Sequence, residues 1–228
     1  MIKRTMNGVV SEFESKRVVY FESEGNDLDG IYEKLDDPKH NQDLELSITG
    51  IFELEKNRNY IRFERSSLGS GRYTELIKGK QTKKMYNKLE SCTFYIFKDF
   101  VCGIGDSNAI KDTRIFLSEI MLLDIPILVP TEINMRNVVD RFDRIEKVSV
   151  ERIKHPNINK ATLTGKGADI GDLADYIDYG VKFVQGLIKF DDEERKIKIG
   201  NNGVINFYKM KEKPLYVSHI EAGYRFFC

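Results

Sequence analysis

Two hydrophobic spacings alternate along this chain, one typical of helices and the other of strands. Apolar residues three and four positions apart mark one face of a helix. On this spacing we predict helices at 27–35, 110–123, 135–145 and 169–184. Runs that alternate, or that are rich in β-branched and aromatic residues, predict strands. These runs are 18–21, 44–54, 60–64, 92–97, 100–104, 127–129, 147–153, 196–199, 204–208, 215–220 and 224–227.

The order of these elements predicts the fold class. Helices and strands follow one another irregularly, with β-rich segments toward both ends, which favours an α+β fold over a regular βαβ series. We expect mixed antiparallel sheets with several amphipathic helices. Turn residues at 57–59, 98–99 and 200–203 indicate hairpins. The Ser- and Gly-rich stretch 66–71 is expected to be a flexible loop.

Length and apolar content bound the organisation and the compartment. The chain has 228 residues, which suits a single domain, 1–228, or two lobes with a boundary near 154–168. No run of about 20 apolar residues occurs, and 1–13 lacks the apolar core of a signal peptide, so we expect no membrane partner. Three cysteines without a Cys-x-x-Cys pair indicate a reducing compartment, and the protein is expected to be cytoplasmic.

Charge is balanced overall but unevenly distributed. The 36 basic and 36 acidic side chains cancel, which excludes an overall polybasic protein but not local patches. Nine acidic residues between Glu22 and Glu45 oppose two lysines, so this segment carries about −7. Six cations between Arg72 and Lys88 oppose only Glu75, which gives that segment about +5.

The basic segment is the first candidate for a binding site. If 75–89 is helical, Lys80, Lys84 and Lys88 lie on one face, with Lys83 beside them. Several cations on one rigid element can neutralise DNA phosphates, which dominate nucleic-acid affinity. The alternative interpretation is a merely solvated helix face.

A second cationic group lies around 136–160. Neighbouring carboxylates dilute it, so ion pairs within the chain explain most of its charge. Taken with the basic segment, it completes the set of candidate nucleic-acid-binding residues. That set is Lys78, Lys80, Lys83, Lys84, Lys88, Arg136, Arg141 and Arg152.

No known catalytic motif occurs in the sequence. There is no GxxxxGKS/T phosphate loop and no GxSxG nucleophile elbow, and the three histidines are widely separated, unlike zinc ligands. We therefore assign no catalytic residue, metal or cofactor. One alternative stays open: Glu194 and Lys196 form the Glu-x-Lys triplet of metal-dependent nucleases, with Asp191 and Asp192 nearby.

The middle of the chain resembles a known group of proteins. A hairpin at 94–105 is followed by Asp106-Ser107 and an amphipathic helix, and then by three further segments. These segments are ILVP at 127–130, RIEKVSVERI at 144–153 and GADIGDL at 167–173. Over roughly 92–190 this order is similar to the RexA-type lambda phage exclusion proteins. It is also similar to the related DNA-binding folds of the RdgC recombination proteins and the Kiwa defence component KwaB.

The resemblance implies double-stranded DNA binding with little sequence preference, as a dimer, in phage defence or prophage exclusion. It carries over no catalytic residue. Our leading hypothesis is therefore a cytosolic DNA-binding protein. The alternatives are the metal-dependent nuclease and a protein-interaction module, a sensor or inhibitor without enzymatic activity. In the last case the acidic segment 22–45, with Asp36 and Asp37, would bind a basic protein partner.

Overall fold

The computed structural model describes the chain in nine stretches. They are 9–11, 16–39, 50–77, 80–130, 132–155, 158–165, 180–190, 193–208 and 214–227. The chain divides into two compact units, one formed by 21–126 and the other by 1–20 together with 127–228. Strand β2 (Lys16–Glu22) passes from one unit into the other between Tyr20 and Phe21.

The predicted fold class is wrong, because strands dominate the structure. Strands account for 56% of the described residues and helices for 21%, in four helices. The described strand pairs are antiparallel, and they build an open sheet architecture rather than an α+β fold with several amphipathic helices.

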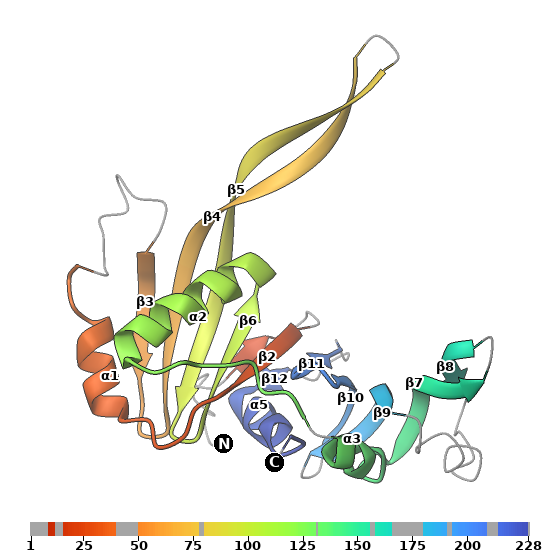
Figure 1. Ribbon diagram of the computed structural model, residues 1–228. Helices are drawn as coiled ribbons and strands as arrows, with labels where there is room; N and C mark the ends of the chain where they lie inside the picture. The colour runs from red at the N-terminus through yellow and green to blue at the C-terminus, as the bar shows by residue number, and fades with distance from the viewer. Residues whose placement is uncertain are drawn as a thin grey trace, which may run out of the picture. The chain divides into compact units, whose positions relative to one another are not determined.

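The unit formed by 21–126 is built on a sheet with the strand order β3-β4-β5-β6. Its strands are β3 (Gly50–Lys56), β4 (Tyr60–Ile77), β5 (Lys80–Phe97) and β6 (Phe100–Gly105). Helix α2 (Ser107–Met121) crosses one face of this sheet, and the short helix α1 (Leu28–Leu35) lies near its β3 side (Figure 1). The predicted helix at 27–35 is confirmed, with the Asp27 side chain accepting a hydrogen bond from the Asp29 N–H at the helix start.

Aromatic rings form the core of this unit. Phe94 is fully buried between Phe21 and Phe63, with ring centroids 5.8 and 5.7 Å away. Cys92 and Cys102 are buried on the adjoining strands β5 and β6. Burial raises the pKa of the Cys92 thiol to about 11, so it stays protonated and unreactive at neutral pH.

Truncating the central ring of this core is expected to destabilise the protein strongly. Phe94→Ala leaves a cavity between two rings that cannot close it, so the free energy of unfolding should fall by about 3–5 kcal/mol. Urea unfolding followed by circular dichroism measures this. Leu122→Ala, at a side chain that is 81% exposed, is the control and should change the free energy by less than about 0.5 kcal/mol. A loss below about 1 kcal/mol in Phe94→Ala would contradict the packing of Phe94 between Phe21 and Phe63.

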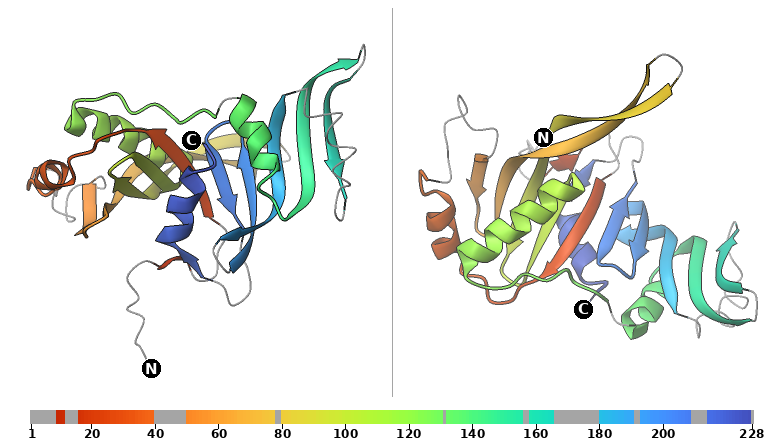
Figure 2. Two further views of the ribbon diagram at one scale, coloured as in Figure 1. Left: turned by 90° about the horizontal axis from the view of Figure 1, so that it is seen from below. Right: turned by 45° about the horizontal axis from the view of Figure 1, so that its top comes forward.

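The other unit holds a second antiparallel arrangement, with strand order β2-β11-β10-β9-β7-β8 (Figure 2). Its strands are β11 (Val204–Phe207), β10 (Glu193–Gly200), β9 (Val181–Phe190), β7 (Arg144–His155) and β8 (Ile158–Thr164). Helices α3 (Glu132–Val139) and α5 (Val217–Tyr224) and the short pair β1 (Val9–Ser11) and β12 (Leu215–Tyr216) complete it. The predicted turn at 200–203 is confirmed, with Gly203 at a φ of +69° that favours glycine.

Several sequence predictions of individual elements were wrong. The predicted loop 66–71 is the middle of β4, and the described residues of 75–89, a segment considered as a helix, belong to β4 and β5. Residues 217–224, predicted to be largely strand, form helix α5, because Val217, Ile220 and Gly223 recur at a helical spacing and are buried. Of the predicted helix 169–184, residues 181–184 are the start of β9, and 169–179 lie outside the described residues.

Candidate nucleic-acid interface

Strands β4 and β5 continue as a two-stranded ribbon past the rest of their sheet (Figure 1). The described pairing of β3 with β4 stops at Ser66, and that of β6 with β5 stops at Cys92. The β4–β5 pairing runs on without a register shift to Ile77 opposite Lys80. We call the ribbon of 67–77 and 80–90 the arm.

The arm is solvated almost throughout. Every residue from Lys80 to Leu89 is exposed. Six large hydrophobic side chains of the arm are also exposed: Leu68, Tyr73, Leu76, Met85, Tyr86 and Leu89. An isolated two-stranded hairpin is at best marginally stable in water, and exposed apolar groups gathered in one place indicate an interaction surface. The arm therefore has the composition of a binding element rather than of a folding core.

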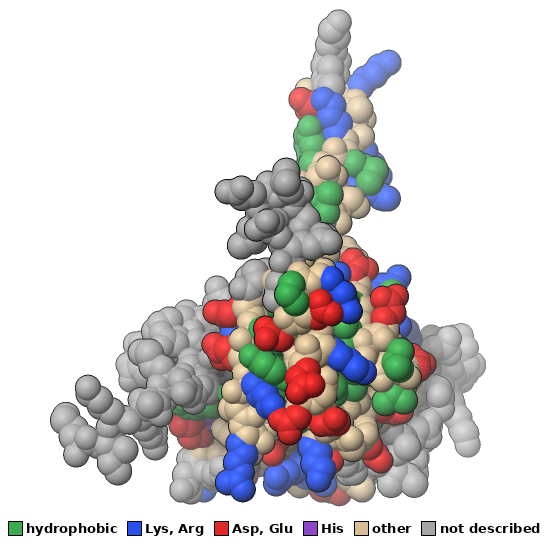
Figure 3. Space-filling model, turned by 90° about the vertical axis from the view of Figure 1, so that its left-hand side faces the viewer, with side chains coloured by type: hydrophobic (Ala, Val, Ile, Leu, Met, Phe, Trp, Pro, Cys, Tyr) green, Lys and Arg blue, Asp and Glu red, His purple; other side chains and the backbone are tan. Residues whose placement is uncertain are grey.

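Register divides the arm into two faces, because directly opposed residues of an antiparallel pair point to the same side. One face, which we call the tyrosine face, carries Tyr73, Glu75, Lys80, Lys84, Tyr86, Lys88 and Glu90. The other, the methionine face, carries Leu68, Arg72, Leu76, Lys83, Met85 and Leu89. Figure 3 shows blue basic and green hydrophobic side chains along the projecting arm.

On the tyrosine face, two rings and a salt bridge lie side by side. The rings of Tyr73 and Tyr86 are 5.9 Å apart at 59°. Lys84, opposite Tyr73, forms an ion pair with Glu75. The Tyr86 ring lies across Gly71 and leaves no room there for a Cβ. Glycine in this strand therefore allows a close side-chain approach and does not mark a loop.

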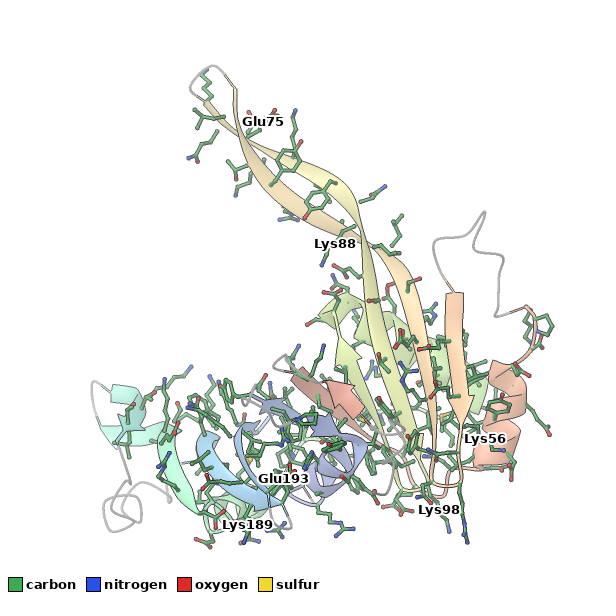
Figure 4. All side chains as sticks on the ribbon, turned by 180° about the vertical axis from the view of Figure 1, so that it is seen from behind. Lys56, Glu75, Lys88, Lys98, Lys189 and Glu193 are labelled. Atoms are coloured by element: carbon green, nitrogen blue, oxygen red, sulfur yellow. The ribbon has the colours of Figure 1, made fainter. Side chains whose placement is uncertain are left out.

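The base of the tyrosine face carries a second set of ion pairs. Lys88 lies 3.3 Å from the Asp106 carboxylate and 3.9 Å from that of Glu90, which is itself buried. Figure 4 shows Glu75 toward the tip of the arm and Lys88 toward its base. The Lys84–Glu75 and Lys88–Asp106 pairs are exposed, and exposed ion pairs contribute about 0–1 kcal/mol. Lys84 and Lys88 can therefore exchange their carboxylates for phosphates at small cost.

The methionine face has a different charge pattern. Arg72 lies directly opposite Met85, and Lys83 lies opposite Thr74. No carboxylate points to this face from the arm's described residues. Met85 is 65% exposed and Leu76 is 70% exposed. This face thus combines cations with solvated apolar side chains.

Across both faces the arm is cationic. Its described residues include five cations, Arg72, Lys80, Lys83, Lys84 and Lys88, and two acids, Glu75 and Glu90, so five minus two gives a net charge of +3. Arginine and lysine at this density on a narrow projecting element give a local positive potential in a chain whose total charge is zero.

The structure brings together four of the eight predicted binding residues. Lys80, Lys84 and Lys88 share one face, as predicted, although the element is a strand and not a helix. Lys83 points to the opposite face, which the helical interpretation missed. Lys78 lies outside the described residues.

The remaining three predicted residues belong to the other unit. Arg141 donates from Nη1 to the Arg225 carbonyl at 2.8 Å, and its guanidinium lies 5.6 Å from the Phe226 ring centroid. It therefore packs against the C-terminal segment. Arg136 lies in α3 and Arg152 in β7, and their side chains are outside the described part of the chain.

The nuclease alternative gains no metal site from the described residues. Glu194 and Lys196 lie two apart on β10, but Lys196 Nζ lies 2.5 Å from Glu146. Its hydrogen bond holds the pKa of the Glu146 carboxyl below its usual range. No group of three His, Cys, Asp or Glu able to hold a metal ion occurs within the described ranges. Asp191 and Asp192 are outside them.

The acidic segment is described only as far as Lys39. Asp37 pairs with Lys39 at 2.7 Å, and Asp29 pairs with Lys56 of β3. Asp36 is exposed at the end of α1. Part of this segment's charge is therefore neutralised within the unit, while 40–45 lie outside the described residues.

Comparison with known proteins adds no family. No protein-family model matches this chain, and none of the curated proteins is similar to it in sequence. In the described residues, no helix is long and apolar enough to cross a membrane.

Proposed function

We propose that this protein binds double-stranded DNA through its arm, with little dependence on base sequence. The observation that carries the proposal is the projecting two-stranded ribbon with five cations and a net charge of +3. The resemblance of 92–190 to phage exclusion proteins supports a cytoplasmic role in phage defence or prophage exclusion, performed by a homodimer.

A ribbon of this shape suits a DNA groove. Proteins that bind DNA with β-strands place them in the major groove or in the minor groove. Strands in an antiparallel pair are about 5 Å apart, and the arm's described cations lie on both of its faces. The cations can therefore reach phosphates of both strands. Phosphate contacts supply nearly all sequence-independent affinity.

The proposal predicts a steep dependence of affinity on salt. With five cations contacting phosphates, log K should fall against log salt with a slope of about −4.5, which weakens binding roughly 500-fold between about 50 and 200 mM. Fluorescence anisotropy with a labelled duplex of about 30 base pairs measures this slope. Each single substitution such as Lys83→Gln should lower its magnitude by about 0.9.

Two further measurements in the same titration distinguish DNA binding from the alternatives. Two duplexes of unrelated sequence should bind within a few-fold of each other. Added Mg²⁺ should produce no cleavage. Degradation that requires Mg²⁺ and disappears in Glu194→Ala would support the nuclease instead. Absence of binding at low salt would exclude DNA and leave a protein partner for the acidic segment, tested by a pull-down that depends on Asp36 and Asp37.

A further inference from the structure

The methionine face holds the most solvated apolar side chains of the arm. Leu76 and Met85 are 70% and 65% exposed, whereas the tyrosines of the opposite face are each less than half exposed. The tyrosine rings pack on one another and on a glycine, but Leu76 and Met85 project from the ribbon where β4 and β5 pair only with each other. Burying such groups would stabilise the protein or its complex by about 25 cal/mol for each Å² of apolar surface removed from water.

The neighbours of these two side chains indicate what would cover them. Arg72 is directly opposite Met85, and Gln81 is directly opposite Leu76. Lys83 and Asn87 lie two residues to either side of Met85 on the same face. Proteins that enter the DNA minor groove contact it through arginine, lysine, asparagine and glutamine. They also insert apolar side chains such as leucine and methionine between base steps.

We propose that the methionine face enters the minor groove and that Leu76 and Met85 wedge between base steps, which bends the duplex. This inference rests on the proposed DNA binding. Pairs 76–81 and 72–85 are four residues apart along the ribbon, or about 13 Å at a strand rise of about 3.3 Å per residue. That distance spans roughly four base pairs at about 3.4 Å each.

Charge argues against a second copy of the chain on this face. Two methionine faces packed together would bring Arg72 and Lys83 of each copy close to those of the other, with no carboxylate between them among the described residues of that face. Like charges brought together in this way oppose association. A polyanion instead complements both cations and accepts the wedges between its stacked bases.

The test is fluorescence resonance energy transfer across a duplex of about 30 base pairs labelled at both ends. Wild-type protein should raise the transfer efficiency at saturation. Leu76→Ala combined with Met85→Ala should abolish that rise, while affinity falls less than about tenfold and the salt slope is unchanged, because the cations remain. The matched control, Leu122→Ala with Leu123→Ala, removes two exposed leucines from the end of α2 and should bend DNA like the wild type.

A duplex that carries a nick or a mismatch gives an independent test of the wedge. A nick or a mismatch lowers the cost of unstacking, so wild-type protein should bind such a duplex about tenfold more tightly than an intact one. The Leu76→Ala, Met85→Ala variant should show no such preference. Both positions are exposed, and circular dichroism should show the same fold.

The outcomes separate this inference from the proposed function. Wild-type binding without a change in energy transfer overturns the wedge and leaves DNA binding standing. Equal bending by the double variant overturns the assignment to Leu76 and Met85. Loss of self-association in the double variant, measured by sedimentation, would overturn the inference in favour of an interface between copies. No binding of any duplex overturns the proposed function itself.

Discussion

Replacing Lys80, Lys83, Lys84 and Lys88 by glutamate is expected to reduce duplex affinity more than about 100-fold, because electrostatic contacts supply essentially all of non-specific DNA binding. Four of the five cations among the arm's described residues become acidic, and Arg72 is the one of these five that remains. The loss should be measured by anisotropy at low salt, where wild-type binding is strongest.

A charge-matched control decides whether location or total charge is responsible. Arg58, Lys98, Lys111 and Lys189 are exposed and lie outside the arm. Reversing four cations changes the net charge by two units each, so both variants go from 0 to −8. Long-range repulsion of DNA is then the same in both. The control should retain most of the affinity, and equal losses in the two variants would refute the arm as the contact surface.

The arm variant should remain folded. Each substituted lysine is exposed, and only Lys84 and Lys88 have described ion pairs. Surface ion pairs are worth about 0–1 kcal/mol, so the thermal midpoint should shift by only a few degrees. A folded variant that binds DNA like the wild type would remove these lysines from the candidate site.

The sequence pattern correctly placed Lys80, Lys84 and Lys88 on one face, but their spacing fits both a helix and a strand. A spacing of four places residues on one face of a helix, and it does the same on a strand, whose side chains alternate with a period of two. The pattern predicted a shared face but could not distinguish the elements. Lys83 is where the two differ, since it neighbours Lys84 on a helix surface and points away from it on a strand.

The long ribbon was missed because its signals are cross-strand. Gly69 and Gly71 are typical of a loop when read along the chain, yet here Glu90 and Tyr86 lie across them from the neighbouring strand. No local window contains both members of these pairs. By contrast, the hairpin of β5 and β6 was predicted, because its two apolar runs are joined by the tight turn Lys98-Asp99 and local pattern suffices.

The second cationic group illustrates the limit of charge counting. Arg141 was selected for its sign, but its guanidinium is engaged by the Arg225 carbonyl and the Phe226 ring. Charge runs show where cations occur, and only the fold shows which of them already contact other groups of the chain. On the arm, Arg72 and Lys83 form no ion pair with any residue that the structure describes, and their face was not predictable before the register was known.

Removing the arm is expected to eliminate DNA binding while leaving the fold intact. Ser67 and Glu90 lie directly opposite each other, so replacing 68–89 by Asn-Gly closes the ribbon with the two-residue turn that antiparallel strands prefer. The excised residues are largely exposed and contribute little burial. The free energy of unfolding should therefore change by less than about 2 kcal/mol, as urea unfolding would measure.

Duplex affinity in the shortened protein should fall to background at every salt concentration. The excision differs from the lysine reversal in two ways. It removes the cations without putting acidic side chains in their place, and it also removes the methionine face. If the shortened protein folds and still binds DNA with a steep salt slope, the phosphate contacts must lie elsewhere. The basic residues of 127–228 would then be the next to be substituted. Loss of binding in both variants, with the fold retained, would locate the contacts on the ribbon by two independent routes.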